Sequence, residues 1–383
     1  MRHILGWVTG RTEPGETPDF NASSVDWGYL GDLLAHHELL AFAYEAFKEY
    51  GLTAPGAMQE KLKNTYYCTL LRNERLMDEL VRITRRFREA GIRVAALKGV
   101  AFLPDIYTSL PVRSMTDIDI LIQDADYQKA AGLLCEMGYY KDFWGLTEEY
   151  WRTKQCHVAF YKKDHNRLSG FVELHWALDV KRGGETILPR LWERTREIYA
   201  NNGPALQTLS PEDALLHIAL HQRRFGKMLC LKYAVDLSLL IQKYKDTFDW
   251  GYVLEEAKSG KMRTSLYFLL SQAAMFLEVR LPPSVEEGLG VSGRKKRRIH
   301  HFIRTSAWLP YEKRDTRKLY LKGHFLLYDH PAEPLTAILN IPREQFAKYY
   351  CLTPYARKTG FFYHTRFAYI PFRTLCDLIP KRR

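Results

Sequence analysis

The chain has 383 residues, of which 46% are hydrophobic and 26% are charged. This composition excludes an intrinsically disordered chain, and the length predicts two or three domains. The formal net charge is +12 at pH 7. The excess of basic side chains lies entirely in residues 181–383, whereas residues 1–180 carry a small acidic excess. A basic half beside a slightly acidic half indicates a polyanionic partner or substrate, such as nucleotide phosphates.

The cysteines and the apolar runs bear on the cellular compartment. Six cysteines are scattered along the chain without C-x-x-C spacing, so a structural zinc knuckle is unsupported. Few and dispersed cysteines fit a reducing compartment. No apolar run reaches the roughly 18 residues of a membrane helix, and the apolar stretch at residues 1–8 is too short for a signal peptide. The sequence therefore predicts a cytoplasmic protein without membrane contact.

Residues 9–24 are rich in Gly, Pro, Thr and Glu and predict a loose segment. Helical periodicity follows over residues 25–50 and 57–90, and Gly91 is a typical helix stop. Short apolar or alternating runs then predict strands at residues 92–97, 118–122, 156–161 and 171–176. Helices are predicted between them at residues 99–108 and 126–137. Beyond residue 181 the pattern predicts helices at residues 210–224, 229–244, 261–278, 294–308 and 313–328.

These elements predict an α/β (α+β) protein with a small mixed sheet at its centre. We expect an N-terminal helical region at residues 1–91, an α/β core at residues 92–180, and a larger, basic helical domain at residues 181–383. A ligand is expected in the cleft between the sheet and the C-terminal helices.

Two carboxylates mark the strand predicted at residues 118–122: Asp117 directly precedes it, and Asp119 is its second residue. Side chains two residues apart on a strand share a face, so the two aspartates would project side by side while Ile118 and Ile120 enter the core. Neighbouring carboxylates repel each other unless a cation or a proton lies between them, and their hard oxygen atoms suit Mg²⁺. The alternative is a solvated Asp-x-Asp pair on an edge strand.

Two further features strengthen the interpretation as a metal site. The run Leu97-Lys98-Gly99 stands at a strand-to-helix junction, where glycine lets backbone amides approach a phosphate. Glu173 offers a third carboxylate on another strand. Lys98 and Arg113 are placed in the sequence to reach phosphate oxygens, with a surface salt bridge as the alternative.

His217 and His221 are four residues apart on a predicted helix, so they share a face. With Asp236 they would make a metal site, but the H-E-x-x-H signature is absent, and we expect both histidines to line the ligand cleft or to lie hydrogen-bonded in the core. The run of five basic residues at 294–298 is either a solvated helix face or a contact for a polyanion.

The combined pattern resembles the uncharacterised bacterial nucleotidyltransferase family within the polymerase-beta superfamily. The resemblance rests on Leu97-Lys-Gly99, Tyr107, Arg113, Asp117-Ile-Asp-Ile-Leu121, Val172-Glu-Leu-His-Trp176, Leu215-Leu-His217, His221 and Leu231-Lys232-Tyr-Ala-Val-Asp236. It spans about residues 92–241. The usual Gly-Ser of the superfamily is Gly99-Val100 here, so one hydroxyl that would contact phosphates is missing.

The resemblance implies a nucleotidyltransferase, dependent on Mg²⁺ or Mn²⁺, that moves a nucleoside monophosphate from an NTP such as ATP to a hydroxyl or phosphate of an unknown acceptor. It implies metal binding by Asp117, Asp119 and Glu173, with Glu173 helping to deprotonate the acceptor. It implies nucleotide binding by Lys98, Gly99, Arg113, His217, His221, Lys232 and Asp236. The expected acceptor is a small molecule, peptide or protein, and nucleic acid is not favoured. The alternative is a non-catalytic protein of the same fold that binds nucleic acid or a partner protein.

Overall fold

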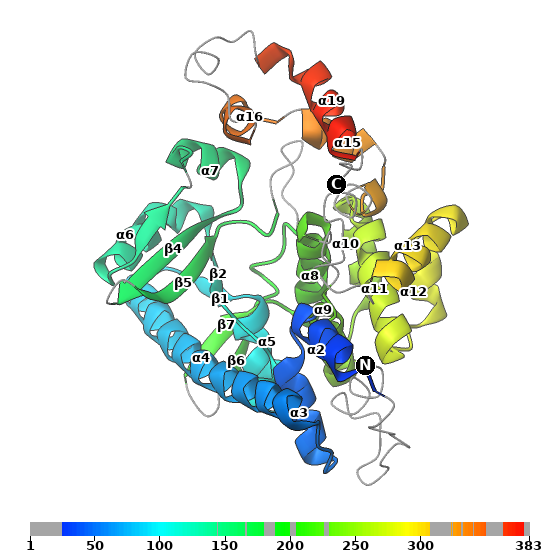
Figure 1. The fold of residues 1–383 in the computed structure, drawn as a ribbon. Helices are drawn as coiled ribbons and strands as arrows, with labels where there is room; N and C mark the ends of the chain where they lie inside the picture. The colour runs from blue at the N-terminus through cyan, green and yellow to red at the C-terminus, as the bar shows by residue number, and fades with distance from the viewer. Residues whose placement is uncertain are drawn as a thin grey trace.

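The computed structural model describes residues 25–143, 145–164, 167–179, 188–199, 204–225, 230–306, 323, 325–330, 332–339, 341–349 and 363–378. The predicted α/β class is confirmed: a mixed sheet lies on one side of the molecule, and groups of helices cover it and extend away from it (Figure 1). The segment predicted to be loose at residues 9–24 and most of the helix predicted at residues 313–328 fall outside the described residues.

Seven strands of the described chain form this sheet, in the order β3-β4-β5-β2-β1-β7-β6. Their bounds are β1 Val94–Ala96, β2 Ile118–Ile122, β3 Tyr140–Asp142, β4 His157–Asp164, β5 Arg167–His175, β6 Arg196–Tyr199 and β7 Ala205–Thr208. β2 pairs antiparallel with β1 and parallel with β5, so the two strands predicted to carry the carboxylates are neighbours at the centre of the sheet. β2 is buried along its whole length, and its only polar residue is Asp119.

The four strands predicted between residues 92 and 176 are confirmed, and the structure adds β3, β6 and β7. β6 and β7 lie beyond residue 180, where the sequence pattern predicts only helices. β7 joins the sheet through the parallel pair of Ala96 and Thr208, whose hydroxyl donates to the Ala96 carbonyl at 2.9 Å. The added strands are only three or four residues long, so their alternation is too short to be recognised from the sequence.

The helices form three groups along the chain. The N-terminal group is α2 Trp27–His36, α3 Leu40–Glu49 and α4 Gly56–Glu89. The helices between the strands are α5 Lys98–Ile106, α6 Tyr127–Glu136 and α7 Glu148–Lys154. The C-terminal group is α8 Pro211–Phe225, α9 Lys232–Tyr244, α10 Trp250–Ser259, α11 Arg263–Leu277, α12 Pro283–Gly288, α13 Gly293–Ser306, α15 Ala332–Leu339, α16 Arg343–Tyr349 and α19 Arg366–Leu378. Within the described ranges, none of these helices combines the length and the apolar character that crossing a bilayer requires.

The single helix predicted at residues 25–50 is two helices, α2 and α3. The chain turns between them at Glu38, which has a left-handed backbone with φ 57°. Asp26 caps the start of α2 by accepting a hydrogen bond from the Tyr29 amide at 2.9 Å. The turn lets the apolar faces of both helices reach the same core.

Two apolar cores hold these elements together. One core lies between the sheet and helices α4 and α6, and it includes Phe87, Ile118, Ile120, Leu134 and Phe160. The other core joins the N-terminal helices to the C-terminal helices, and it includes Phe42, Phe47, Leu215, Leu237 and Phe268. Helices α2 and α3 therefore share a core with α8, α9 and α11, while α4 runs along the base of the molecule (Figure 1).

A buried ion pair connects the sheet to the C-terminal helices. Arg113, which lies shortly before β2, donates from Nε and Nη2 to the two carboxylate oxygens of Asp236 on α9, at 2.8 and 2.7 Å. The Tyr107 hydroxyl donates to the same carboxylate at 2.6 Å. Arg113 is 4% exposed and Asp236 is fully buried. Each of these charges is out of water, so each depends on the other.

Replacing Asp236 with Asn would leave Arg113 buried without its counter-charge. We expect the free energy of unfolding to fall by about 3–5 kcal/mol, the usual loss when one partner of a buried pair is removed. Urea denaturation measures this change. The control is Asp246→Asn, at an exposed carboxylate just beyond the end of α9, which should change the free energy by less than about 0.5 kcal/mol. Equal effects of the two variants would contradict a supporting role of the pair.

Candidate active site

The structure brings Asp119 and Glu173 together at the centre of the sheet. They are direct partners in the parallel pair of β2 and β5, so both side chains leave the same face. An oxygen of each carboxylate and a nitrogen of His175 all lie within 4.8 Å of one another. Asp117 directly precedes β2 and, being two residues from Asp119, is directed to that face as well. The three carboxylates predicted from the sequence thus gather on one face of the sheet.

Lys98 lies between two of these carboxylates. Its Nζ atom is 2.6 Å from Asp119 Oδ1 and 3.6 Å from Glu173 Oε2. Burial acts to lower the pKa of Lys98, but Asp119 and Glu173 together outweigh it, so the pKa is raised and the ammonium group stays charged. Lys98 is also the first residue of α5 and has a φ of 48°. A left-handed backbone at a residue other than glycine costs about 1 kcal/mol, and such strain is typical of functional sites.

His175 supplies the second positive charge. Its Nε2 atom is 3.1 Å from Asp119 Oδ1 and 3.3 Å from Glu173 Oε2. Burial opposes protonation, but Asp119, Cys156 and Glu173 outweigh it and raise the pKa of His175 to about 10. Burial in turn acts to raise the pKa of each carboxyl, whereas Lys98 and His175 hold the pKa of both Asp119 and Glu173 below the ordinary range. Both carboxylates are therefore ionised at neutral pH.

Asp117 behaves differently from the other two acids. Burial and the neighbouring charges of Asp119 and Glu173 raise the pKa of Asp117 to about 7, against the weaker opposing effects of Lys98 and Lys232. Two of the three carboxylates are thus balanced by Lys98 and His175, while Asp117 carries the excess negative charge. A divalent cation among three carboxylates would remove this repulsion, and an all-oxygen ligand set fits Mg²⁺ or Mn²⁺.

Gly99 is required by the close approach of Arg113. A Cβ atom at Gly99 would lie 2.4 Å from Arg113 Nη1 and 2.9 Å from the side chain of Met115. Because Arg113 is held by Asp236, it has little freedom to move away. The glycine therefore packs against the buried ion pair, and this packing explains the residue type without any phosphate contact.

His217 and His221 on α8 line the same small cavity as Lys98, Glu173 and His175. The cavity measures about 20 Å³, which is room for a water molecule or an ion and far too little for a nucleotide. Burial first, and then the positive charges of Lys98 and His175, lower the pKa of His217 well below its ordinary value, so this imidazole is neutral.

Lys232 lies at the start of α9, next to the N-terminal helices. Its Nζ atom donates to Glu38 Oε2 at 2.5 Å and to the Ser114 carbonyl at 3.5 Å. Its positive charge also acts on Asp117, where it partly opposes the rise of the pKa. Lys232 thus links the acidic face of the sheet to the turn between α2 and α3, whereas Asp236, one turn further along α9, is engaged by Arg113.

Sequence reasoning assigned no role to Cys156, His157 or His175. Two sequence features could have pointed to them: Cys156 and His157 are adjacent, and His175 stands two residues after Glu173. Only the antiparallel pairing of β4 with β5, which sets His157 opposite His175, brings the three side chains together.

Carboxylates on two central strands of a mixed sheet, beside a helix that begins at Lys98-Gly99, are the arrangement expected of a nucleotidyltransferase. The comparison with known families agrees with this class. A family model described as "Uncharacterised nucleotidyltransferase" matches residues 23–278, and the chain belongs to this family. No curated protein matches the chain. The matched range contains the whole sheet, all three carboxylates and the Arg113–Asp236 pair, whereas α12 to α19 lie beyond it.

Replacing Asp117 with Asn should stabilise the metal-free protein in a pH-dependent way. The pKa of Asp117 is about 7 in the folded protein, against an ordinary value of 3.8. The carboxyl group of Asp117 therefore destabilises the fold increasingly as the pH rises between these two values, and the full loss of stability is present above them. At about 1.4 kcal/mol per pKa unit the gain in the variant is up to about 4 kcal/mol at pH 8, and it should vanish near pH 4.

Chemical denaturation of both proteins at the two pH values, in the presence of a chelator, measures this difference. Asp126→Asn, at the last residue of the short 3-10 helix that follows β2, is the control and should leave the pH dependence unchanged. A variant that is no more stable than the parent protein at pH 8 would contradict the repulsion among the three acids.

Proposed function

We propose that the protein is a nucleotidyltransferase, dependent on Mg²⁺ or Mn²⁺, that moves a nucleoside monophosphate from an NTP such as ATP to a hydroxyl or phosphate of an acceptor, with release of pyrophosphate. The observation that carries this proposal is the pairing of Asp119 with Glu173 on neighbouring strands, with Asp117 directed to the same face. Membership of the family supports the class of reaction, and we place that family within the polymerase-beta superfamily.

In this proposal Asp117, Asp119 and Glu173 hold the metal ions through their carboxylate oxygens. The ions would neutralise charge on the attacking and leaving oxygens of an in-line displacement at the α-phosphate. Lys98 and His175 keep Asp119 and Glu173 ionised, so both acids are ready to act as ligands at neutral pH. Glu173 is the residue proposed to take the proton of an acceptor hydroxyl, because it is the more exposed of these two acids.

The other residues assigned to the nucleotide divide into two kinds. Lys98, His217 and His221 line the cavity beside the carboxylates, and Lys232 acts on Asp117 electrostatically, so these side chains are the proposed contacts for the phosphates. Gly99, Arg113 and Asp236 are engaged with one another, and we propose that they serve nucleotide binding by holding the junction between the sheet and α9.

The proposed acceptor is a small molecule, a peptide or a protein. A cytoplasmic location is also part of the proposal. It is supported by Cys68, Cys135, Cys156 and Cys230, none of which forms a disulfide, as is usual in a reducing compartment.

A second candidate function is non-catalytic binding of nucleic acid or a partner protein by the same fold. Val100 favours it, because this residue is 1% exposed and offers no hydroxyl beside Gly99. The basic run on α13 also favours it in part. Arg294, Arg297 and Arg298 are exposed, whereas Lys295 bonds the Tyr328 carbonyl and Lys296 pairs with Glu286 at 2.8 Å.

Thermal unfolding with each NTP, with and without Mg²⁺, tests the first candidate against the second. An NTP and Mg²⁺ together should raise the melting temperature more than either one alone, because the phosphates and the carboxylates share the metal ions. Asp119→Asn should abolish this joint effect and lower pyrophosphate release in the presence of acceptor by about 100-fold or more.

The matched control is Asp78→Asn, which removes an exposed carboxylate on α4 and should behave like the parent protein. Salt-sensitive binding of a generic oligonucleotide, without any joint effect of NTP and Mg²⁺, would favour the second candidate instead.

A further inference from the structure

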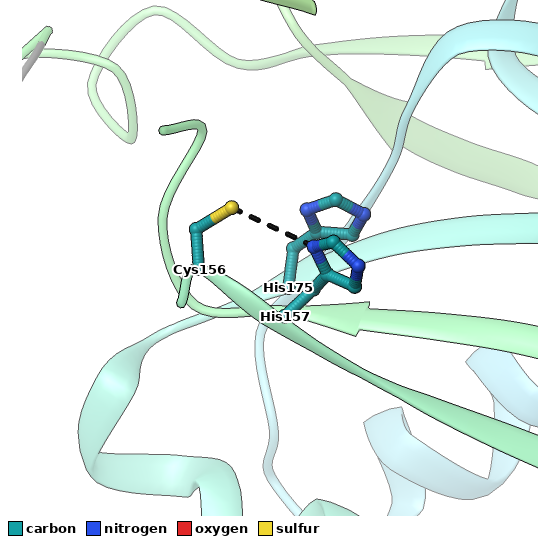
Figure 2. A group of neighbouring side chains, drawn as sticks. All are labelled: Cys156, His157 and His175. Carbon is teal, nitrogen blue, oxygen red and sulfur yellow. Dashed lines mark hydrogen bonds between the residues drawn. The ribbon is translucent and has the colours of Figure 1, made fainter. Parts of the chain in front are cut away.

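A second group of ligand-type side chains adjoins the carboxylates. Cys156 directly precedes β4, His157 is the first residue of β4, and His175 is the last residue of β5. One ligand atom from each of the three lies within 4.8 Å of the others. All three residues are buried, with exposed fractions of 1%, 8% and 3% respectively. Figure 2 shows the two imidazole rings side by side, each with one nitrogen turned toward the Cys156 sulfur.

The two nitrogens of each ring face different partners. His175 Nε2 is within 3.3 Å of Asp119 and Glu173 oxygens, and His157 Nε2 is 3.7 Å from Glu173 Oε1. On the opposite side, His157 Nδ1 is 3.6 Å from the Cys156 sulfur. The buried Nδ1 atom of His175, which also faces that sulfur, makes no hydrogen bond of ordinary geometry.

This division of roles is the one that metal-binding histidines show. A carboxylate that accepts the N–H of one ring nitrogen fixes the tautomer and leaves the lone pair of the other nitrogen for a metal ion. Here Asp119 and Glu173 lie within hydrogen-bond distance of His175 Nε2, whereas His157 Nε2 makes only a 3.7 Å ion-pair contact with Glu173, and the Nδ1 atoms of both rings point toward the sulfur.

The spacing also fits a tetrahedral ion. Zinc–sulfur bonds of about 2.3 Å and zinc–nitrogen bonds of about 2.0–2.1 Å place the two ligand atoms about 3.6 Å apart at a tetrahedral angle. The distance between Cys156 Sγ and His157 Nδ1 is 3.6 Å. A thiolate with two imidazoles is a ligand set that selects Zn²⁺ and related transition metals over Mg²⁺.

We propose that Cys156, His157 and His175 bind one transition-metal ion of the zinc type through the sulfur and the two Nδ1 atoms. The cavity of about 20 Å³ that these residues share with Glu173 and the α8 histidines has room for a single ion or water. Three protein ligands leave a fourth position of the ion open toward this cavity. The proposal does not rest on the transferase activity, since it uses a different set of ligand atoms.

Such an ion would position the neighbouring acidic site. It would lock both imidazole rings, and the locked Nε2 donor of His175 would hold Glu173 and Asp119 in their observed orientation. Binding requires the Cys156 thiol to lose its proton and the two Nδ1 atoms to be free of theirs, so the metal displaces protons into solvent. His157 and His175 are therefore positioning residues for the carboxylates.

The test is a titration of the chelator-washed full-length protein with Co²⁺ and, separately, with Zn²⁺. We expect one equivalent of Co²⁺ to produce thiolate-to-cobalt charge-transfer absorption, which only a bound sulfur ligand gives, and we expect one equivalent of Zn²⁺ to abolish that absorption by displacement. Parent protein that shows no such absorption with Co²⁺ overturns the proposal, whatever the behaviour of the variants.

Three variants assign the ligands. Cys156→Ser should lose the charge-transfer absorption, whereas Cys230→Ser, at a buried free thiol elsewhere in the fold, should keep it. Asp117→Asn should also keep it, which separates this site from the proposed magnesium site. Absorption that persists in Cys156→Ser, or that is lost in Cys230→Ser alone, overturns the assignment.

The α8 histidines provide a last control. His217→Ala should retain one equivalent of Zn²⁺ after dialysis, and circular dichroism should show that its fold is intact. Loss of the metal in His217→Ala together with retention in His157→Ala would place the ion on helix α8 and refute the proposed ligand set.

Discussion

Repulsion among three carboxylates on one face of the sheet is the constraint on which the site depends. Asp119 and Glu173 are fixed side by side by the register of β2 and β5, so they have no means of moving apart. Lys98, at the start of α5, and His175, at the end of β5, balance these two negative charges. Asp117 is left with a pKa of about 7. This imbalance is the physical argument for the cation site that we propose there.

The frame around this site is held by a different electrostatic device. The buried pair of Arg113 and Asp236 joins the segment before β2 to helix α9, and Tyr107 completes the hydrogen bonds of the carboxylate. Gly99 is the residue that lets Arg113 pass beneath the start of α5. Because Lys98 is its neighbour, the placement of the Lys98 ammonium between the acids depends on the same packing.

The rings of His157 and His175 separate the hard carboxylate oxygens from the soft Cys156 sulfur. On the Nε2 side of His157 and His175 lie the carboxylates, which suit magnesium, and on the Nδ1 side lies the Cys156 sulfur, which suits zinc. The rings, with centroids 4.7 Å apart, are therefore shared between two environments. A change on the sulfur side would be felt by Glu173 through the orientation of these rings.

Local patterns in the sequence determined the central strands and the spacing of their acids. β2 and the shared face of Asp117 and Asp119 follow from alternation with period two, which needs no knowledge of the rest of the chain. The tertiary structure alone decided that Lys98 neutralises Asp119, that Arg113 pairs with Asp236, and that His157 meets His175. These contacts join residues far apart in the chain, and strand register and helix packing, which create them, leave no periodic trace in the sequence.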